Sequence, residues 1–217
     1  MTSRLMIVDD DPLVRSGLRL LVGGDPGLEV IAEAGDGREA LARYAADPVD
    51  LLLMDLRMPV MDGIDATAAF KSAPNPPAVI VLTTFDADEY VVRALAVGAD
   101  GFLLKDTPPP EIITAIGRVL AGEPALSPSV TAALIKQVVD GRDGNRESTA
   151  REAVDALTGR EREVAVCLAR GASNAEIASE LYMSVATVKA HISRIFTKLD
   201  AANRVQVAIR IHDAGLT

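Results

Sequence analysis

The N-terminal half of the chain alternates short apolar runs with longer amphipathic stretches. The amphipathic stretches repeat their apolar residues at helical spacing, whereas the short runs are typical of buried strands. We place five strands near residues 5–8, 28–34, 49–54, 78–83 and 101–104. Strands that alternate with helices predict an α/β fold with a doubly wound, five-stranded parallel sheet.

The pattern changes after Gly122. Two prolines, Pro124 and Pro128, precede the polar stretch DGRDGNRESTAR from Asp140 to Arg151. This composition indicates a flexible linker over residues 123–151, in which residues 130–139 can form a short helix. The chain therefore divides into a domain over residues 1–122 and a smaller domain over residues 152–217.

The C-terminal domain contains the start signals of helices. The predicted caps are Thr158 with Glu161, Ser173 with Glu176, and Ser184. The first two are capping boxes, in which side chains satisfy backbone donors at a helix N-terminus. A last helix is expected from Arg204 to about Ala214, giving four in all. The second and third helices are only a few residues apart, which is the spacing of a helix-turn-helix.

The third helix has two different faces. Its apolar face holds Val188, Ile192, Ile195 and Leu199, and its opposite face holds Ala186, Lys189, Ala190, Ser193 and Thr197. The first face is expected to pack on the domain. The side chains of the second face are mostly small or polar, so this face is either a solvated surface or a surface that approaches DNA closely.

The last helix carries two apolar rows. One consists of Val205, Ala208 and Ile209, and the other of Val207, Ile211 and Ala214. One row is enough to dock the helix on its domain. We therefore expect the other row, through Val207 and Ile211, to contact a second copy of the chain.

Polar residues follow four of the predicted strands. They are Asp9, Asp10 and Asp11 after the first, Asp55 after the third, Thr83 and Thr84 at the fourth, and Lys105 after the fifth. In parallel sheets these strand ends share one edge, where ligands bind. Carboxylates gathered there need a cation, and a hard divalent ion such as Mg²⁺ is the natural partner for Asp9, Asp10 and Asp55. Lys105 and Thr83 would hold phosphoryl oxygens, with Asp55 as acceptor.

Neither Asp11 nor Asp62 is assigned to this chemistry. Asp11 precedes Pro12 and is expected to cap the next helix, while Asp62 shapes the turn that it forms with Gly63.

Composition is that of an ordinary folded chain with two small domains: 217 residues, 49% of them hydrophobic, without tryptophan. The single cysteine, Cys167, excludes an internal disulfide. No apolar run is long enough to span a membrane, and the acidic start from Met1 to Asp11 lacks the pattern of a signal peptide. The expected compartment is the cytoplasm.

Charge is distributed unevenly along the chain. The net charge is −9, and residues 1–125 hold 10 Lys and Arg against 20 Asp and Glu, whereas residues 151–217 hold 9 against 8. The acidic first half argues against nucleic-acid contact there and agrees with a metal and phosphate pocket.

The strand-end residues resemble those of the receiver domain of bacterial two-component response regulators. The resemblance covers about the first 120 residues: an acidic pair after the first strand, an acceptor aspartate before RMPVMDG, and a lysine 22 positions beyond a threonine (105 minus 83). It implies that Asp55 receives phosphate from a phosphohistidine of a sensor histidine kinase. By the same resemblance, Mg²⁺ is bound by Asp9, Asp10, Asp55 and the backbone carbonyl of Arg57, Thr83 and Lys105 contact the phosphate, and Phe102 is the aromatic switch residue.

The C-terminal motifs LTGREREV, GASNAEIASEL and TVKAHISRIFTKL resemble the DNA-binding domain of LuxR-type regulators over about 60 residues. The whole chain is thus similar to NarL/FixJ-type response regulators, which implies promoter DNA as a partner, a homodimer on phosphorylation, and RNA polymerase as a further candidate partner. By this resemblance, Lys189, Ala190 and Ser193 enter the major groove, and Thr187 and His191 lie near phosphates.

Two other functions use some of the same residues. A metal-dependent phosphatase with an aspartyl phosphate needs a second carboxylate two positions after the nucleophile, and Arg57 occupies that position. A DNA-binding regulator whose receiver is a phosphorylation-independent docking module is the alternative, against which the complete acidic set and Lys105 count. We therefore expect a phosphoacceptor regulator whose only reaction of its own is slow autodephosphorylation.

Overall fold

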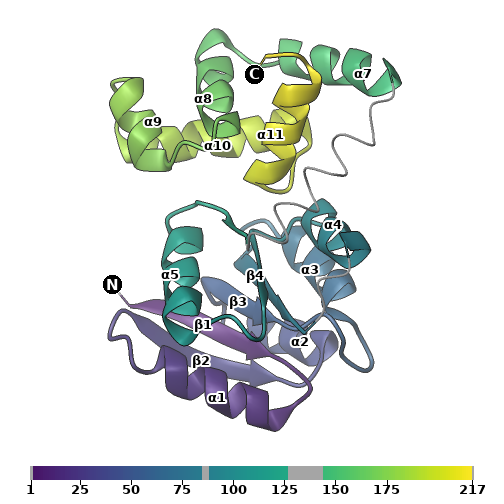
Figure 1. Cartoon of the computed structure of the whole chain (residues 1–217), viewed down its shortest axis with the longest axis vertical. Helices are drawn as coiled ribbons and strands as arrows, with labels where there is room; N and C mark the ends of the chain where they lie inside the picture. The colour runs from purple at the N-terminus through teal and green to yellow at the C-terminus, as the bar shows by residue number, and fades with distance from the viewer. Residues whose placement is uncertain (1, 85–87, 127–143, 217) are drawn as a thin grey trace. The chain divides into compact units, whose positions relative to one another are not determined.

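The computed structural model of the chain describes residues 2–84, 88–126 and 144–216. The chain divides into two compact units, an α/β unit from the N-terminal half and a helical unit from the C-terminal half (Figure 1). The predicted short helix over residues 130–139 lies outside the described residues.

The α/β unit is built on a parallel sheet in the order β2-β1-β3-β4-β5-β6. Its strands are β1 (Ser3–Val8), β2 (Leu28–Ala34), β3 (Leu51–Met54), β4 (Ala78–Thr83), β5 (Gly101–Leu104) and β6 (Ala125–Leu126). The doubly wound parallel sheet is confirmed, but it has a sixth strand where the sequence predicted the start of a linker. Strand β6 is only two residues long and pairs with β5 at the sheet edge, so no apolar run marks it.

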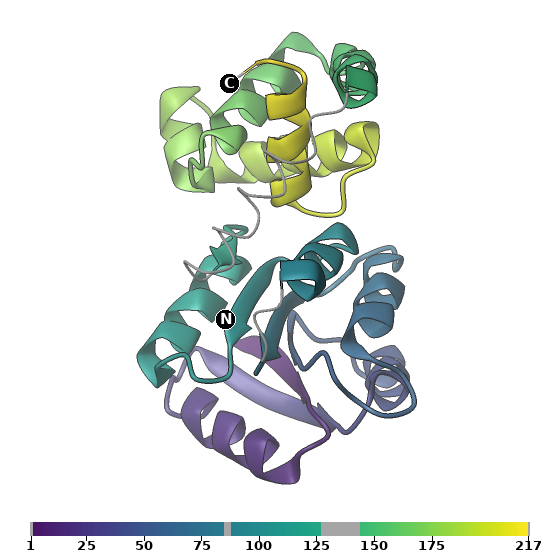
Figure 2. The same cartoon turned by 45° about the vertical axis from the view of Figure 1, so that its right-hand side comes forward.

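Helices cover both faces of this sheet (Figure 2). Helices α1 (Pro12–Val22) and α5 (Pro109–Leu120) share one face, where their apolar residues form a core with alternate strand residues such as Ile7 and Leu53. Helices α2 (Gly37–Ala46), α3 (Gly63–Lys71) and α4 (Asp88–Ala96) pack side by side on the other. The continuous burial of β3 follows from this two-sided cover.

The N-termini of α1 and α3 are fixed by aspartates. Asp11 accepts a hydrogen bond from the backbone of Leu13, with Pro12 in the first turn, which confirms its predicted capping role. Asp62 caps α3 by accepting from the backbone of Asp65 at 2.8 Å. Both caps satisfy backbone donors that a helix start leaves without partners.

Gly63, the first residue of α3, lies against the backbone of Asp55. A Cβ atom at this glycine would stand 2.0 Å from the carbonyl oxygen of Asp55, and the Gly63 amide donates to the carbonyl of Leu56 at 2.9 Å. Because these neighbours are backbone atoms, they cannot move aside as a flexible side chain would. The absence of a side chain at position 63 therefore lets α3 begin directly beside Asp55.

The helical unit contains α7 (Gly144–Asp155), α8 (Gly159–Ala169), α9 (Asn174–Glu180), α10 (Val185–Leu199) and α11 (Arg204–Asp213). Both predicted capping boxes are present, and Ser184 caps α10. Helix α7 replaces the C-terminal part of the predicted flexible linker. Its sequence is polar, but Ala150 and Val154 are buried in the core of the unit, and tertiary packing outweighs the local composition.

The two faces predicted for α10 are confirmed. Val188, Ile195 and Leu199 are buried, and Ile192 packs against the same core. The residues of the opposite face, Ala186, Lys189, Ala190, Ser193 and Thr197, are exposed.

In α11, the assignment of Val207 and Ile211 to a contact with a second copy is wrong. Both residues are fully buried in the core of the helical unit, where α11 packs on α8 and α7. This row docks the helix, and the partly exposed row is the one that contains Val205 and Ile209. The sequence showed two apolar rows, and α7, which was predicted as linker, helps to cover the row that contains Val207 and Ile211.

A buried carboxylate joins α8 to α10. Glu161 accepts hydrogen bonds from the Lys198 ammonium at 2.7 Å and from the Thr158 amide at 2.8 Å. These two bonds, the one from Lys198 foremost, lower the pKa of Glu161 to about 2 against burial, which raises it. Glu161 is therefore charged throughout the neutral pH range.

We predict that Gly63→Ala destabilises the protein by roughly 1–3 kcal/mol, because the added methyl group must displace backbone beside Asp55. Gly17→Ala is the matched control: it lies inside α1, and an added Cβ there meets nothing within 4 Å. The control should gain about 0.5–1 kcal/mol. Urea unfolding measures both, and an increase in stability for both variants would refute the packing argument.

The ion pair of Glu161 predicts a specific dependence of stability on pH. Its pKa is lower in the folded protein than the ordinary value of 4.5, so its contribution is complete above that value and is lost as pH falls from 4.5 toward about 2. The difference in unfolding free energy between the parent and Glu161→Gln should therefore shrink over this range. Urea unfolding followed by circular dichroism tests this, and a difference that stays constant as the pH is lowered to about 3 would contradict it.

Candidate functional site

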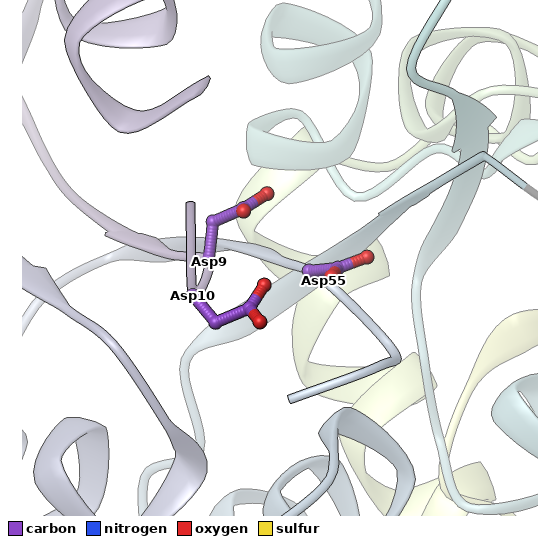
Figure 3. A group of neighbouring side chains, drawn as sticks. All are labelled: Asp9, Asp10 and Asp55. Carbon is purple, nitrogen blue, oxygen red and sulfur yellow. The ribbon is translucent and has the colours of Figure 1, made fainter. Parts of the chain in front are cut away.

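Strands β1 and β3 carry three carboxylates to one edge of the sheet. Asp9 and Asp10 follow β1, and Asp55 follows the neighbouring β3. One oxygen from each carboxylate can be chosen so that all lie within 4.8 Å of one another. Figure 3 shows the three side chains gathered at this edge. The structure thus brings together the acidic residues that the strand-end pattern predicted.

Lys105 lies among these carboxylates. Its ammonium is 2.6 Å from Oδ2 of Asp9 and 3.3 Å from Oδ2 of Asp55. Its backbone amide donates to the carbonyl of Thr83 at 2.8 Å, which continues the pairing of β5 with β4 beyond Leu104. The sheet therefore fixes the position from which the ammonium reaches both acids.

The two charges at the centre of the site perturb each other's titration. Burial raises the pKa of Asp55, the Lys105 ammonium lowers it, and the Asp9 carboxylate raises it, with a net shift upward. Burial lowers the pKa of Lys105, but the hydrogen bond to Asp9 and the charge of Asp55 outweigh it, so that this pKa is raised. Lys105 is therefore held as a cation.

The donor set of the cluster fits a hard divalent cation. Asp10 is exposed to solvent, whereas Asp9 and Asp55 are buried, so an ion can approach from the Asp10 side. Asp9 keeps Oδ1 engaged with the Asp11 amide at 3.0 Å, and this hydrogen bond fixes the orientation of its carboxylate. Closely placed carboxylate oxygens are the ligands that such ions prefer.

Arg57 stands in the loop after Asp55. Its guanidinium carbon lies 5.7 Å from the centre of the Tyr90 ring in α4. A cation over an aromatic face is attracted by the ring, so this contact joins the loop to α4. No sequence signal pointed to Tyr90, because nothing in a helical pattern shows which loop the helix will face.

Thr83 and Phe102 lie on the neighbouring strands. Thr83 ends β4 and is buried, paired in register with Leu104. Phe102 has an exposed fraction of 0%. A switch residue that turns inward on phosphorylation must start from an outward position, and this ring is already inside. An inward turn of the Phe102 ring is therefore not available from the state that the structure describes.

The residues predicted to contact DNA lie on α10. Thr187, Lys189, Ala190 and Ser193 are exposed, and His191 is half-buried. Thr187 also shares a hydrogen bond of 2.8 Å with the hydroxyl of the cap residue Ser184. The structure therefore supplies one accessible, polar helix surface from residues close in sequence.

Two residues beside this surface were missed in the sequence. Arg194 is exposed, and its guanidinium lies 3.4 Å from Nδ1 of His191. It follows Ala190 by one helical turn, so helical spacing could have identified it. Tyr182, in the turn between α9 and α10, is 96% exposed, and its backbone has the left-handed conformation with φ of 53°. An aromatic residue in this conformation is unusual, and sequence gives no signal for it.

None of the helices in the described part of the chain is both long enough and apolar enough to cross a membrane.

Comparison with known families assigns both units. Residues 5–117 match the response regulator receiver domain, and residues 155–211 match the luxR family of bacterial regulatory proteins. The first match contains the acidic cluster and Lys105, and the second contains α10.

Individual relatives match along almost the whole length of the chain. The chain is 39% identical to YxjL, an uncharacterized transcriptional regulatory protein of Bacillus subtilis, over 95% of this chain and 93% of that protein. It is 37% identical to the transcriptional regulatory protein LiaR of the same organism, over 96% of each. The crystal structure of the response regulator ChrA, from a heme-sensing two-component system, is 34% identical, with a TM-score of 0.54 over 100% of this chain and 99% of that one. The chain therefore belongs to the DNA-binding response regulators of two-component systems, with a receiver domain followed by a LuxR-type helix-turn-helix domain.

Proposed function

We propose that Asp55 accepts a phosphoryl group from a phosphohistidine of a sensor histidine kinase, and that this reaction controls binding of promoter DNA by α10. The observation that carries the proposal is the meeting of three carboxylates and Lys105 at the edge of the sheet. The same chain exposes a polar face on α10. The α/β unit thus holds a site for an added charge, and the helical unit holds a surface whose binding to DNA this charge can regulate.

The reaction forms a bond from a carboxylate oxygen of Asp55 to phosphorus and breaks the bond from phosphorus to the donor nitrogen. The donor histidine keeps the electron pair of that bond and takes up a proton. Lys105, already 3.3 Å from Asp55, is placed to pair with a phosphoryl oxygen, and the Thr83 hydroxyl is proposed to donate to another. Lys105 thereby stabilises negative charge as the phosphoryl group arrives.

Mg²⁺ is the ion that we propose for the carboxylate cluster. Asp9, Asp10 and Asp55 would hold it together with the backbone carbonyl of Arg57. When bound, it neutralises charge on the transferring phosphoryl group. The requirement is physical: the incoming group is an anion, and the cluster that receives it is acidic.

We expect loss of the phosphate to be slow. A phosphatase of the aspartyl-phosphate type needs an acid/base carboxylate two positions after the nucleophile, and Arg57 occupies that position with its guanidinium over Tyr90. The protein is accordingly proposed to hold its phosphate as a signal rather than to turn over a substrate.

DNA contact is proposed for the exposed face of α10. Lys189, Ala190 and Ser193 would enter the major groove, and Thr187 and His191 would lie near phosphates. Lys189 contributes the positive charge of this set, and the small side chains of Ala190 and Ser193 allow close approach to base edges.

Dimerisation is proposed as the route to useful affinity. Residues 1–125 hold 20 acidic against 10 basic residues, and residues 151–217 hold 9 basic against 8 acidic, so a single copy is attracted to DNA only weakly. Two copies on adjacent half-sites raise the effective concentration of each. Since Val207 and Ile211 are buried, the partly exposed Val205 and Ile209 are the apolar residues of α11 that could serve.

We place the protein in the cytoplasm, where the kinase, promoter DNA and RNA polymerase, its further candidate partner, would be met. The proposed domain boundaries assign residues 1–122 to the receiver domain and residues 152–217 to the DNA-binding domain.

We predict that Asp55→Asn abolishes acid-labile phosphorylation by an active histidine kinase in Mg²⁺, because the amide lacks the nucleophilic carboxylate. Asp62→Asn is the matched control: it removes the same charge from the same loop, and asparagine caps a helix as well as aspartate does. Radiolabel transfer followed on a gel measures both variants. Labelling of Asp55→Asn at the parental level would disprove the assignment, and excess EDTA should remove labelling of the parent and of the control alike.

We predict that Lys189→Ala weakens specific DNA binding by about 1–3 kcal/mol, the range for a base-reading or well-placed phosphate contact. The fold should survive, because Lys189 lies opposite the buried face of α10. Arg170→Ala removes the same charge at the exposed end of α8 and serves as control. A gel-shift titration in which both variants bind like the parent, with unchanged circular dichroism, would exclude Lys189 from the interface.

A further inference from the structure

The first turn of α8 holds the region of α10 at two places. The guanidinium of Arg160 donates a hydrogen bond to the carbonyl of Leu181, in the turn between α9 and α10. The next residue, Glu161, pairs with Lys198 in the last turn of α10. Two adjacent side chains of α8 therefore contact α10 near both of its ends: one contacts the turn that precedes the helix, and the other contacts its last turn.

The Glu161 carboxylate is enclosed by donors. Its side chain is only 5% exposed, and Oε2 accepts from Lys198 and from the Thr158 amide. Its other oxygen, Oε1, lies 3.9 Å from Nε of Arg194, which stands one turn before Lys198. The carboxylate is thus tied to its own helix cap and to two successive turns of α10.

The side chain of Lys198 is 34% exposed, but its ammonium is hydrogen-bonded within the domain. Its ammonium donates to the backbone carbonyl of Ala156 at 3.2 Å as well as to the carboxylate of Glu161, so two of its three N–H groups are used within the protein. The bond to Lys198 is also the main reason why the pKa of Glu161 stands at about 2. The ion pair is therefore present at any pH at which the protein would meet DNA.

Apolar packing alone leaves the orientation of α10 loosely specified. Val188, Ile195 and Leu199 hold the helix against the core, but contacts between such side chains are not directional. Hydrogen bonds are directional, and a base-reading surface must be held to a fraction of an ångström. A small rotation of α10 about its axis would displace Lys189 from the position in which it meets DNA.

We propose that Glu161 is a positioning residue for DNA recognition: through Lys198 it fixes the orientation of α10, while Arg160 fixes the turn that precedes the helix. This inference rests on the proposed role of α10 as the helix that reads DNA. It assigns Glu161 and Lys198 no contact with DNA and gives them an effect on specificity.

Three variants of the full-length chain separate this role from general stability. Glu161→Gln keeps the size of the side chain and an oxygen for the Thr158 amide, since glutamine also serves in capping boxes, but it removes the charge that Lys198 needs. Lys198→Met removes the cation from the other side. Glu152→Gln, on an exposed residue of α7, makes the same charge change as Glu161→Gln and is the control.

The probes are a duplex that the parent protein selects from a randomised pool and a random-sequence duplex of the same length. Affinities are measured at a temperature well below unfolding and over a range of salt concentrations. We expect Glu161→Gln and Lys198→Met each to weaken binding to the selected duplex roughly tenfold, with binding to the random duplex within about twofold of the parent. The salt dependence of binding should not change, and Glu152→Gln should bind both duplexes like the parent. The double variant with Glu161→Gln and Lys198→Met should bind the selected duplex no more weakly than the weaker of the two single variants.

Other results would overturn the inference. Equal loss of affinity for both duplexes, or none for either, would leave Glu161 a purely structural residue. A smaller salt dependence in Lys198→Met, with normal binding by Glu161→Gln, would make Lys198 a phosphate contact instead.

If Glu161→Gln does not fold, the comparison of Lys198→Arg with Lys198→Met decides. The arginine retains the charge and should bind the selected duplex like the parent, and equal loss in both variants would refute the ion-pair role. A parent protein that selects no duplex at all would instead refute the proposed function of α10, which is a separate outcome.

Discussion

The repulsion among three carboxylates, offset by one lysine, is the constraint on which the receiver unit depends. Asp9, Asp10 and Asp55 place oxygens within 4.8 Å of one another, and Lys105 contacts the two that are buried. Such a cluster is sensitive to any added charge, because burial, the Lys105 ammonium and the Asp9 carboxylate already shift the pKa of Asp55. A phosphoryl group on Asp55 would compete with Asp9 for Lys105, which directly follows β5, and β5 carries the buried Phe102 three residues earlier. A change in the contacts of Lys105 at the site can therefore be passed along the strand to the buried core.

The sequence predicted that these residues meet at one edge of the sheet, and the reason is topological. Parallel strands buried on both faces are recognisable as apolar runs, and their carboxyl ends must meet at one edge, so Asp9, Asp55 and Lys105 could be placed together from the sequence alone. Features that depend on tertiary packing could not be predicted. Strand β6 is too short to leave a pattern, and α7 is polar by composition. The choice between the two rows of α11 depended on whether other helices covered Val207 and Ile211, which they do.

In the helical unit, local capping and long-range positioning use the same residue. The capping box of α8 was predicted from Thr158 and Glu161 alone, and the structure confirms it. The contact of Glu161 with Lys198, 37 positions further along the chain, has no local signal. A motif that looks like a helix start in the sequence thus also determines where the predicted DNA-reading surface of α10 is held.

The central claim is that charge at Asp55 controls DNA binding by α10, and one measurement tests it most directly. The affinity of full-length protein for a duplex with two adjacent binding sites is determined before and after phosphorylation, together with the mass of the protein by sedimentation. The account predicts tighter binding and a larger mass after phosphorylation, with neither change in Asp55→Asn treated in the same way. Identical affinity and mass with and without phosphate on Asp55 would contradict it.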